Sequence, residues 1–412
     1  MTFAFLMHDP LASTLMLLAL LWLSAKVGGE MAVRLQLPAV TGELAVGLAL
    51  TAIHRVWPLF PDVTASPATE MLGGLGVVVL MFAVGLESTV PQMLKVGAAS
   101  LRVALIGVVL PMAAGLTGAW LLLPKDSPFV LDLFIGACLC ATSIGISAQV
   151  LREKGASDSI EGRIIVGAAV VDDVLGLLVL VAVSGMVGAA AGGAVGPELT
   201  KTLALALGFL AAALTLGRLV TPRLFQLASR FRGEQILLPL GLGFAFLLAW
   251  LGNLAGLASI VGAYAAGLIL EPAHIVDLER REQHTLEELV HPLVTVLSPL
   301  FFVLMGAKVD PMALFKPSTL GFAALLALLG VAGKYLAGYG GGKGIRAAVV
   351  GWGMVPRGEV GLIFVAAGAQ LQLNGAPLLS ADVQAGVIGA LLITTVVGPV
   401  GLGWVLKART GV

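Results

Sequence analysis

The chain has 412 residues, of which 58% are hydrophobic and 12% are charged, and its formal net charge is +0. A mean hydropathy of +1.01 does not describe a soluble surface, and the neutral charge gives no bias toward nucleic acid or acidic substrates. Apolar runs of about 20 residues, the length of one helical crossing of a bilayer, recur along the chain and do not alternate as barrel strands would. The composition therefore predicts an all-α integral membrane protein.

Thirteen apolar runs, separated by charged or Pro/Gly-rich joints, are expected to be transmembrane helices. They cover residues 11–26, 38–53, 71–87, 100–123, 128–150, 164–188, 202–220, 235–252, 255–270, 290–306, 319–338, 347–370 and 384–405. Seventeen Lys and Arg residues fall after odd-numbered runs or at the C-terminus, and only five fall after even-numbered ones. The positive-inside rule then predicts a multi-pass protein of the cell (inner or plasma) membrane, with its N-terminus outside and its C-terminus in the cytoplasm.

The thirteen runs also divide into two sets of six around a linker helix. The first six-helix repeat covers 1–188, the linker covers 202–220 and the second repeat covers 235–405, within a single membrane transporter domain over 1–412. If the repeats are inverted, the fifth and twelfth runs, 128–150 and 347–370, correspond to one another. Both contain a polar or Pro/Gly interruption, which is the pattern expected of broken helices at a transport site. No long polar segment indicates a soluble regulatory domain.

Asp172 and Asp173 lie in the middle of an apolar run, IIVGAAVVDDVLGLLVLVAV. One charge at the centre of a bilayer helix costs at least about 2.5–3.5 kcal/mol, so a purely structural acid pair is the weaker alternative. Adjacent residues point about 100° apart on a helix, so one carboxylate can bind an ion while the other meets a structural partner. Burial and mutual repulsion favour retention of a proton by the pair, and Na⁺ would displace it. The pair predicts a site where H⁺ and a hard cation compete.

Other polar residues inside apolar runs are expected to complete this site. Lys334, among the small residues of LALLGVAGKYLAGYGGG, is expected to pair with one of the aspartates and to carry an exchanged proton; extension to the membrane interface is the alternative. Arg357 and Glu359 follow a proline, and we expect them to compensate each other or a neighbouring helix end at a broken crossing. Thr142 and Ser143 would add hydroxyl and carbonyl oxygens, which hard cations prefer.

Taken in order, these runs resemble bacterial cation:proton antiporters of the NapA type, which are related more distantly to NhaA. The resemblance covers nearly the whole chain and rests on LPAVTGELAVGLAL, LMFAVGLE, ATSIGISAQVL, GAAVVDDVLGL, PLFFVLMGAKVD, AGKYLAGY and GWGMVPRGEVGLI. It implies a homodimer in the lipid membrane, with a core domain and a dimerisation domain. In the core, two broken helices would cross, and the core would move as an elevator.

The resemblance also implies roles for individual residues. Asp173 matches the principal ion-binding carboxylate, Asp172 matches its neighbour, and Lys334 matches a lysine that forms a salt bridge with the pair. Arg357 and Glu359 match charges beside the crossover. Relatives with an Asn–Asp pair and no lysine look electroneutral, so this chain is expected to be electrogenic, exchanging one Na⁺ or Li⁺ for two H⁺. Neither a cofactor nor enzymatic activity is expected.

Two rival transporters are left open by the sequence. A K⁺/H⁺ antiporter on the same scaffold would differ only in cavity size and ligand number. A sodium-coupled symporter of an organic anion shares the crossed-helix fold, but it has no need of Asp172, Asp173 and Lys334 together. A channel would show a repeated filter-like segment, and an intramembrane enzyme would show an activated nucleophile or a metal motif; we find none of these in the sequence.

Overall fold

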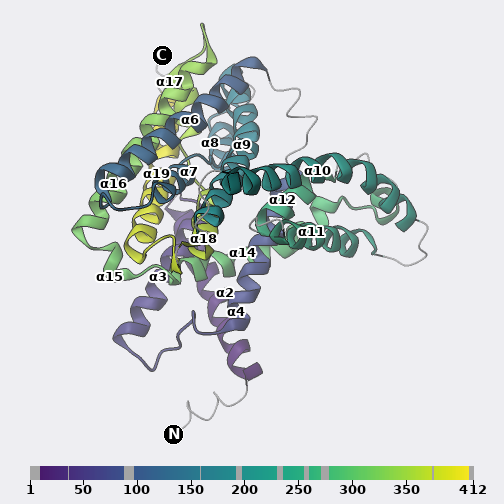
Figure 1. Ribbon diagram of the computed structural model, residues 1–412, viewed down its shortest axis with the longest axis horizontal. Helices are drawn as coiled ribbons and strands as arrows, with labels where there is room; N and C mark the ends of the chain where they lie inside the picture. The colour runs from purple at the N-terminus through teal and green to yellow at the C-terminus, as the bar shows by residue number, and fades with distance from the viewer. Residues whose placement is uncertain are drawn as a thin grey trace. The chain divides into compact units, whose positions relative to one another are not determined.

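The computed structural model consists of helices joined by short connections. It describes residues 10–35, 37–87, 97–157, 159–191, 197–229, 235–254, 259–270, 278–373 and 375–407. Within these ranges the one sheet is an antiparallel hairpin of β1 (Gln372–Leu373) and β2 (Ala376–Pro377). The chain divides into two compact units that alternate along the sequence, and the ribbon of Figure 1 shows their helices.

The first unit combines residues 1–89 with residues 208–311. Its helices are α2 (Pro10–Arg34), α3 (Ala39–Val56), α4 (Pro67–Glu87), the second part of α10 (Pro197–Ala228), α11 (Leu237–Leu254), α12 (Ser259–Ile269) and α14 (Leu286–Ala307). Here α14 packs against α3 and α4, while α12 packs against α4 and α11. A capping box begins α14: the Glu288 amide donates to Thr285 Oγ1 at 3.1 Å, and the Thr285 amide donates to the Glu288 carboxylate at 3.0 Å.

Glycines allow the backbones of the first unit to approach one another closely. A Cβ atom on Gly47 of α3 would lie 1.9 Å from the carbonyl oxygen of Val303 on α14. In the reverse direction, a Cβ atom on Gly306 of α14 would lie 2.1 Å from the carbonyl oxygen of Leu44. Membrane helices associate through such small residues because lipid supplies no hydrophobic driving force between them. Any larger residue at these positions would push α3 and α14 apart.

The second unit combines residues 90–207 with residues 312–412. Besides the first part of α10, its helices are α6 (Ala98–Leu122), α7 (Phe129–Cys138), α8 (Ile144–Glu153), α9 (Ile160–Ala191), α16 (Pro317–Ala337), the 3-10 helix η1 (Gly338–Gly341), α17 (Ala347–Met354), α18 (Glu359–Gln370) and α19 (Ala381–Lys407). The short helix α15 (Pro311–Leu314) lies at the boundary of the two units. In this unit α16 packs against α6 and α19, and α9 packs against α6 and α7 (Figure 1).

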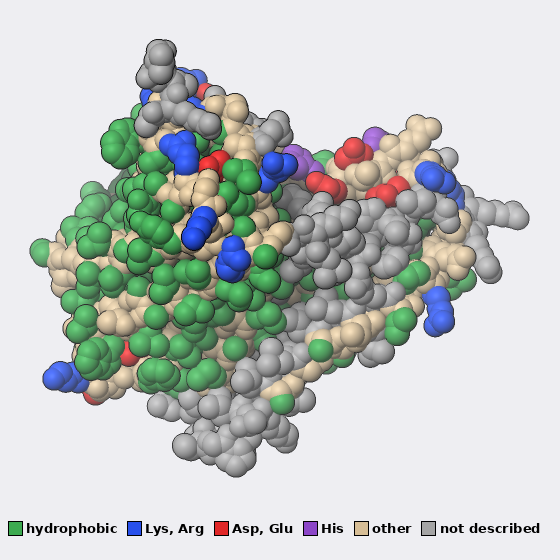
Figure 2. All heavy atoms as spheres, turned by 90° about the horizontal axis from the view of Figure 1, so that it is seen from above, with side chains coloured by type: hydrophobic (Ala, Val, Ile, Leu, Met, Phe, Trp, Pro, Cys, Tyr) green, Lys and Arg blue, Asp and Glu red, His purple; other side chains and the backbone are tan. Residues whose placement is uncertain are grey.

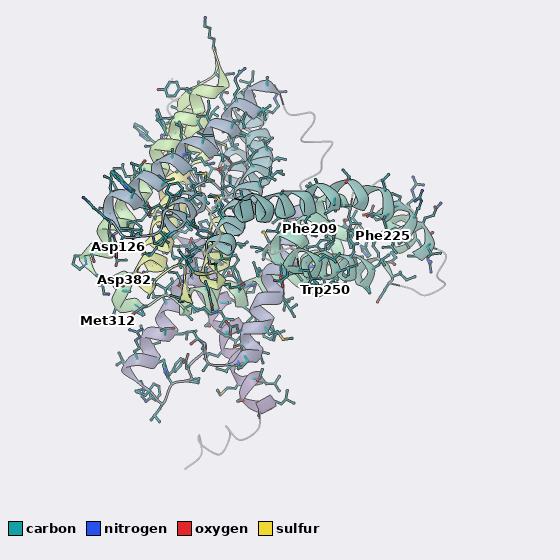
Figure 3. The ribbon with its side chains drawn as sticks, viewed as in Figure 1. Asp126, Phe209, Phe225, Trp250, Met312 and Asp382 are labelled. Atoms are coloured by element: carbon teal, nitrogen blue, oxygen red, sulfur yellow. The ribbon has the colours of Figure 1, made fainter. Side chains whose placement is uncertain are left out.

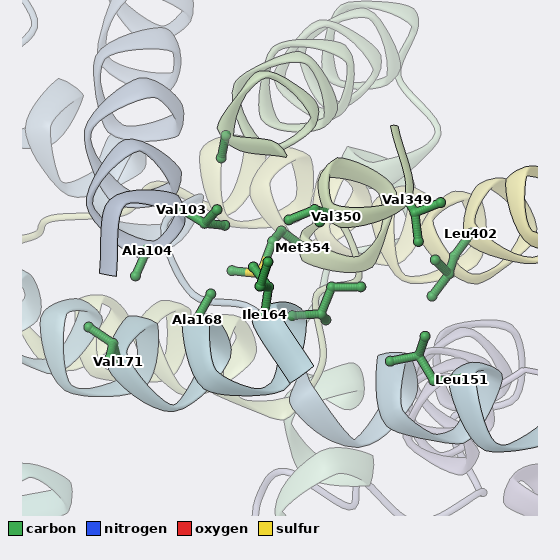
Figure 4. Packing of buried hydrophobic residues seen from close by; sticks show 12 residues of the cluster. Val103, Ala104, Leu151, Ile164, Ala168, Val171, Val349, Val350, Met354 and Leu402 are labelled. Atoms are coloured by element: carbon green, nitrogen blue, oxygen red, sulfur yellow. The ribbon is translucent and has the colours of Figure 1, made fainter. Parts of the chain in front are cut away.

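A cluster of buried apolar side chains surrounds the first half of α9 (Figure 4). Its members come from α6, α8, α9, α16, α17 and α19, and they are Val103, Ala104, Leu151, Ile164, Ile165, Ala168, Val171, Ala337, Val349, Val350, Met354 and Leu402. Val171 directly precedes Asp172 in the chain. Because close packing on one face of a helix fixes its rotation, this cluster also fixes the directions in which Asp172 and Asp173 point.

Nine helices of the described residues are at least 18 residues long and apolar enough to cross a membrane. They are α2, α3, α4, α6, α9, α11, α14, α16 and α19. Hydrophobic side chains cover much of the face drawn in Figure 2, where the charged side chains stand in small groups. Such a surface is stable against lipid, since all helical backbone groups bond internally. The predicted all-helical membrane architecture is therefore confirmed.

Each of the thirteen predicted runs overlaps a helix or a pair of helices, although the number of crossings stays a prediction. Two runs are interrupted as predicted: 128–150 forms α7 and α8, and 347–370 forms α17 and α18. The predicted linker, 202–220, is part of a longer helix, α10. Each compact unit takes residues from both predicted repeats, and the repeats and the single transporter domain stay predictions.

Candidate functional site

The interruptions of the two broken helices lie against each other in the second unit. One interruption separates α7 from α8, and the other separates α17 from α18. Three hydrogen bonds join them: Ser143 N to the Pro356 carbonyl at 2.8 Å, Thr142 Oγ1 to the Met354 carbonyl at 3.1 Å, and Ser147 Oγ to the Gly353 carbonyl at 2.6 Å. These bonds satisfy carbonyl groups that the broken helices leave without helical partners.

Gly358 allows this close approach of the two interruptions. A Cβ atom on Gly358 would lie 2.5 Å from Ser143 Oγ and 2.7 Å from Ser143 Cβ, distances that no side chain tolerates. Gly353 is equally confined, since its Cβ atom would lie 2.4 Å from Ile165 Cδ1 on α9. Gly353 and Gly358, on either side of Pro356, therefore bring the second break into contact with α9 and with the first break.

Arg357 lies fully buried where the interruptions meet, with 0% of its surface exposed. Its Nη1 atom donates to the Ala141 carbonyl at 2.6 Å, and its own carbonyl accepts a bond from Thr395 Oγ1 on α19. A guanidinium suits this place because the C-terminal end of α7 carries partial negative charge. Within the described ranges of the chain, Nε and Nη2 have no hydrogen-bond partner, and Nη2 faces Gly330 of α16, whose Cβ atom would be 3.7 Å away.

Lys334 and Asp172 form a buried ion pair between α16 and α9. Lys334 Nζ donates to both carboxylate oxygens of Asp172 at 2.9 Å, and both side chains are 0% exposed. The amine also lies against α6, where a Cβ atom on Gly107 would be 3.5 Å from it. Here α6 and α16 approach closely, since a Cβ atom on Gly333 would lie 2.8 Å from Pro111 N. The small residues around Lys334 thus give the amine its space.

Asp173 is the next residue on α9 and is 8% exposed. Because it points about 100° away from Asp172, it lies outside the Lys334 ion pair and meets different neighbours. Besides Asp132 and Glu161, the second unit buries the carboxylates of Asp172 and Asp173 and the cationic side chains of Lys334 and Arg357 within one set of packed helices. Within the described part of the chain, no three His, Cys, Asp or Glu residues come together as ligands for a resident metal.

The structure brings together most of the residues that the sequence singled out. Thr142, Ser143 and Arg357 lie at the meeting of the two interruptions, and Lys334 reaches Asp172 instead of the membrane interface. The cation of Arg357 compensates a neighbouring helix end, which was one of the two expected roles. Glu359 begins α18, but its side chain lies outside the described residues. The roles of these residues in ion binding stay predictions.

The sequence analysis missed two residues that the structure draws attention to. Thr395 of α19 holds the backbone beside Arg357, and nothing in its local sequence distinguishes it from other helical threonines. Asp132 of α7 is 4% exposed, and its Oδ1 atom has no hydrogen-bond partner in the described part of the chain. A signal for Asp132 was present, because it is a charge inside the apolar run FVLDLFIGAC, and the rule applied to Asp172 and Asp173 applies to it as well.

Comparison with known proteins identifies the family to which these features belong. The sodium/hydrogen exchanger transmembrane family matches residues 16–408. Over 94% of this chain and 89% of the relative, the sequence is 34% identical to the high-affinity Na⁺/H⁺ antiporter NhaS3 of Synechocystis sp.. It is 30% identical to a Na⁺/H⁺ antiporter of Enterococcus hirae, over 95% of this chain and 97% of that protein. The Na⁺/H⁺-K⁺ antiporter GerN of Bacillus cereus is 29% identical over 95% and 96% of the two chains.

Among solved structures, the sodium proton antiporter MjNhaP1 of Methanocaldococcus jannaschii has a similar fold. The TM-score is 0.70 over 97% of both chains, at 18% sequence identity. This likeness concerns the fold, whereas the family match and the relatives concern the sequence itself, and the relatives named above are transporters. The resemblance found in the ordered motifs is thus confirmed: the chain belongs to the sodium/hydrogen exchanger family.

Proposed function

We propose that this chain is a secondary active antiporter that exchanges Na⁺ or Li⁺ for H⁺ at Asp172 and Asp173. The observation that carries the proposal is the buried ion pair of Asp172 with Lys334, beside a second buried carboxylate and two broken helices. A permanent structural pair would need no second aspartate in the apolar run. The names of the relatives supply the substrates, because two of those reported above are Na⁺/H⁺ antiporters.

The ion pair suggests how a cation enters the site. Breaking a buried pair costs about 3–5 kcal/mol when one charge is left alone, so Lys334 leaves Asp172 only when another cation replaces it. Na⁺ bound by Asp173 and Asp172, with hydroxyl or carbonyl oxygens of Thr142 and Ser143, provides that replacement. Hard monovalent cations prefer such oxygen ligands. The site then holds either Na⁺ or protons, and this competition couples the two flows.

Two protons for each Na⁺ follow from the same arrangement. Asp173 gives up one proton when Na⁺ binds, and Lys334, once released from Asp172 into an apolar setting, loses a second. One net positive charge then crosses the membrane in each cycle, so transport is electrogenic. Arg357 stays charged throughout, since a guanidinium retains its proton. From the meeting point of the breaks, its positive charge stabilises the negative charge of the aspartates.

Alternating access is proposed to occur by an elevator movement of the second unit. All of the site residues belong to that unit, and its own hydrophobic cluster packs it independently of the first unit. A carrier that moves its ion together with its site requires such a self-contained body. We further propose that the chain forms a homodimer in the cell membrane, with its N-terminus outside, as the distribution of Lys and Arg predicts.

Exchange of K⁺ for H⁺ is the second candidate. GerN, which is 29% identical over 95% of this chain, is named a Na⁺/H⁺-K⁺ antiporter, so the scaffold of this chain is compatible with K⁺ as well. Reconstitution into liposomes distinguishes the candidates. With a pH gradient imposed, lumenal pH is followed as Na⁺, Li⁺ or K⁺ is added, and the proposal expects flux with Na⁺ and Li⁺. Flux with K⁺ alone would favour the second candidate, and no cation-evoked flux would refute both.

A further inference from the structure

Asp132 is a buried carboxylate that the exchange described above does not use. It lies in the first turn of α7, the residue is only 4% exposed, and Oδ1 has no hydrogen-bond partner among the residues that the structure describes. The positive end of the α7 dipole favours an acid in this turn, but that interaction is available to an exposed acid as well and does not require burial. Buried polar groups are nearly always bonded, so this one needs another explanation.

A second buried polar group of the same kind lies on the neighbouring helix. Ser184 of α9 is 4% exposed, and its Oγ atom bonds to none of the residues whose positions the structure describes. Helical serines usually donate to a carbonyl one turn earlier, as Thr395 does on α19, and Ser184 does not. Since α7 and α9 pack against each other, Asp132 and Ser184 belong to the same packed part of the second unit.

Both residues lie on one side of the transport site. The break after α7 is level with the ion pair, because Cys140 Sγ donates to the Val108 carbonyl at 3.5 Å while Lys334 lies against the adjacent Gly107. Asp132 precedes Cys140 by about 12 Å along the helix, at 1.5 Å per residue. It lies toward the C-terminal end of α6, since α6 and α7 run antiparallel, with Gly136 against Gly115.

Ser184 lies on that same side. The short connection after α8 leads directly into the start of α9, so α8 and the beginning of α9 share the opposite side of the break. Beyond Asp172, α9 continues toward the side occupied by α7, and Ser184 is about 18 Å further along at 1.5 Å per residue. Asp132 and Ser184 therefore both stand between the aspartate pair and the membrane face at which α9 ends.

We propose that Asp132, with Ser184 as a second polar group on the same side of the unit, is a relay site for Na⁺ and H⁺ between that membrane face and Asp172 and Asp173; this rests on the proposed exchange. The carboxylate attracts cations into the unit from that face and accepts protons in transit. With a single carboxylate as its charged ligand, the relay site binds Na⁺ weakly and completes its coordination with water. A weak intermediate site speeds entry and exit without trapping the ion, as conduction pathways require.

The test measures Na⁺-evoked H⁺ flux from each side of the membrane separately. The full chain is reconstituted in liposomes with one orientation, which is verified by cleavage at a protease site added to the C-terminus. For Asp132→Asn, kcat/KM for Na⁺ added at the face where α9 ends should fall about tenfold, the scale of electrostatic attraction into a charged cleft. The value for Na⁺ added at the other face should stay within about twofold.

Asp126→Asn is the matched control. Asp126 is an exposed carboxylate six residues earlier, in the connection before α7, and it is labelled in Figure 3. The Asp126→Asn substitution removes the same charge from the same end of the unit without changing a buried residue. The Na⁺-evoked H⁺ flux of this variant should therefore equal that of the unaltered protein. An equal loss in Asp126→Asn and Asp132→Asn would overturn the relay, because surface charge alone would then explain the effect.

Two further variants keep the test decisive if Asp132→Asn folds poorly. Asp132→Glu retains the carboxylate and should restore most of the flux, and Ser184→Ala should lower kcat/KM from the same face by a smaller factor. An equal loss from both faces would refute the relay and would assign Asp132 to folding or to the transport site itself. Absence of Na⁺-evoked flux in the unaltered protein would refute the proposed exchange instead, so the two failures are distinguishable.

Discussion

Removal of the Lys334 amine should destabilise the protein and uncouple one proton from each transported Na⁺. The amine donates to both oxygens of Asp172 at 2.9 Å, and both side chains are 0% exposed. Loss of one partner of such a pair costs about 3–5 kcal/mol, since the other charge is left buried alone. In Lys334→Met, the Asp172 carboxylate stays in the apolar interior without its cationic partner.

A double-mutant cycle measures this cost. Thermal unfolding is followed in detergent for the unaltered protein, Lys334→Met, Asp172→Asn and the double variant, at mildly acidic and mildly alkaline pH. For 412 residues, about 0.9 kcal/mol per degree of unfolding entropy predicts a loss of about 3–6 °C for Lys334→Met. The double variant should recover most of that loss, because no uncompensated charge remains. Additive losses, or a Lys334→Met protein as stable as the unaltered one at both pH values, would refute the reasoning.

The same variant tests the assignment of the second proton. In liposomes, Lys334→Met should exchange one H⁺ for each Na⁺ and should no longer respond to an imposed membrane potential. Lys334→Arg retains the charge but releases no proton, so it should also lose the response to potential while keeping more of the thermal stability. A Lys334→Met protein that still exchanges ions electrogenically would show that the second proton comes from another group.

Four further outcomes are expected. Asp173→Asn should abolish Na⁺-evoked H⁺ flux in liposomes while the protein stays folded. The apparent KM for Na⁺ of the unaltered protein should rise as pH falls, with kcat unchanged, because H⁺ competes for the same carboxylates. Gly358→Ala should lower the flux and cost about 1–3 kcal/mol of stability, since its Cβ would lie 2.5 Å from Ser143 Oγ. Thr395→Val should cost about 1 kcal/mol by removing its bond to the Arg357 carbonyl.

Matched controls exist for the last two variants. Gly403→Ala changes a glycine of α19 whose Cβ would meet nothing within 4 Å, so its stability should rise slightly or stay constant. Thr394→Val removes a buried hydroxyl that bonds only within its own helix, to the Leu391 carbonyl, and it should leave the break intact. Equal flux losses in Gly358→Ala and Gly403→Ala would contradict the role given to the close contact of the breaks.

Much of the fold could be predicted because lipid imposes simple rules on a sequence. Runs of apolar residues must be helical when no water is present to satisfy the backbone, so the positions of the helices followed directly. The interruptions at 139–143 and 355–358 were also predictable, since hydroxyl residues, glycine and proline break an apolar run visibly. The division into two interleaved units was harder to foresee, because it depends on which helices pack together and not on any local pattern.

The site was predictable wherever a charge appeared where lipid permits none. That rule found Asp172, Asp173, Lys334 and Arg357, but sequence alone left open which aspartate meets the lysine. Since both aspartates are adjacent on α9, the answer depends on the rotation of the helix, which the packing around Val171 determines. Contacts made by ordinary residues could not be predicted, as with Thr395, because a helical threonine carries no unusual cost.

The coupling of Na⁺ to a membrane potential tests the central proposal most directly. The unaltered protein is reconstituted in liposomes loaded with a pH-sensitive dye, Na⁺ is added at fixed pH, and a potential is then imposed with valinomycin and a K⁺ gradient. We expect H⁺ flux that depends on Na⁺, changes in rate with the potential and disappears in Asp173→Asn. Flux that requires no Na⁺ or Li⁺, or that persists in Asp173→Asn, would contradict exchange at the buried aspartate pair.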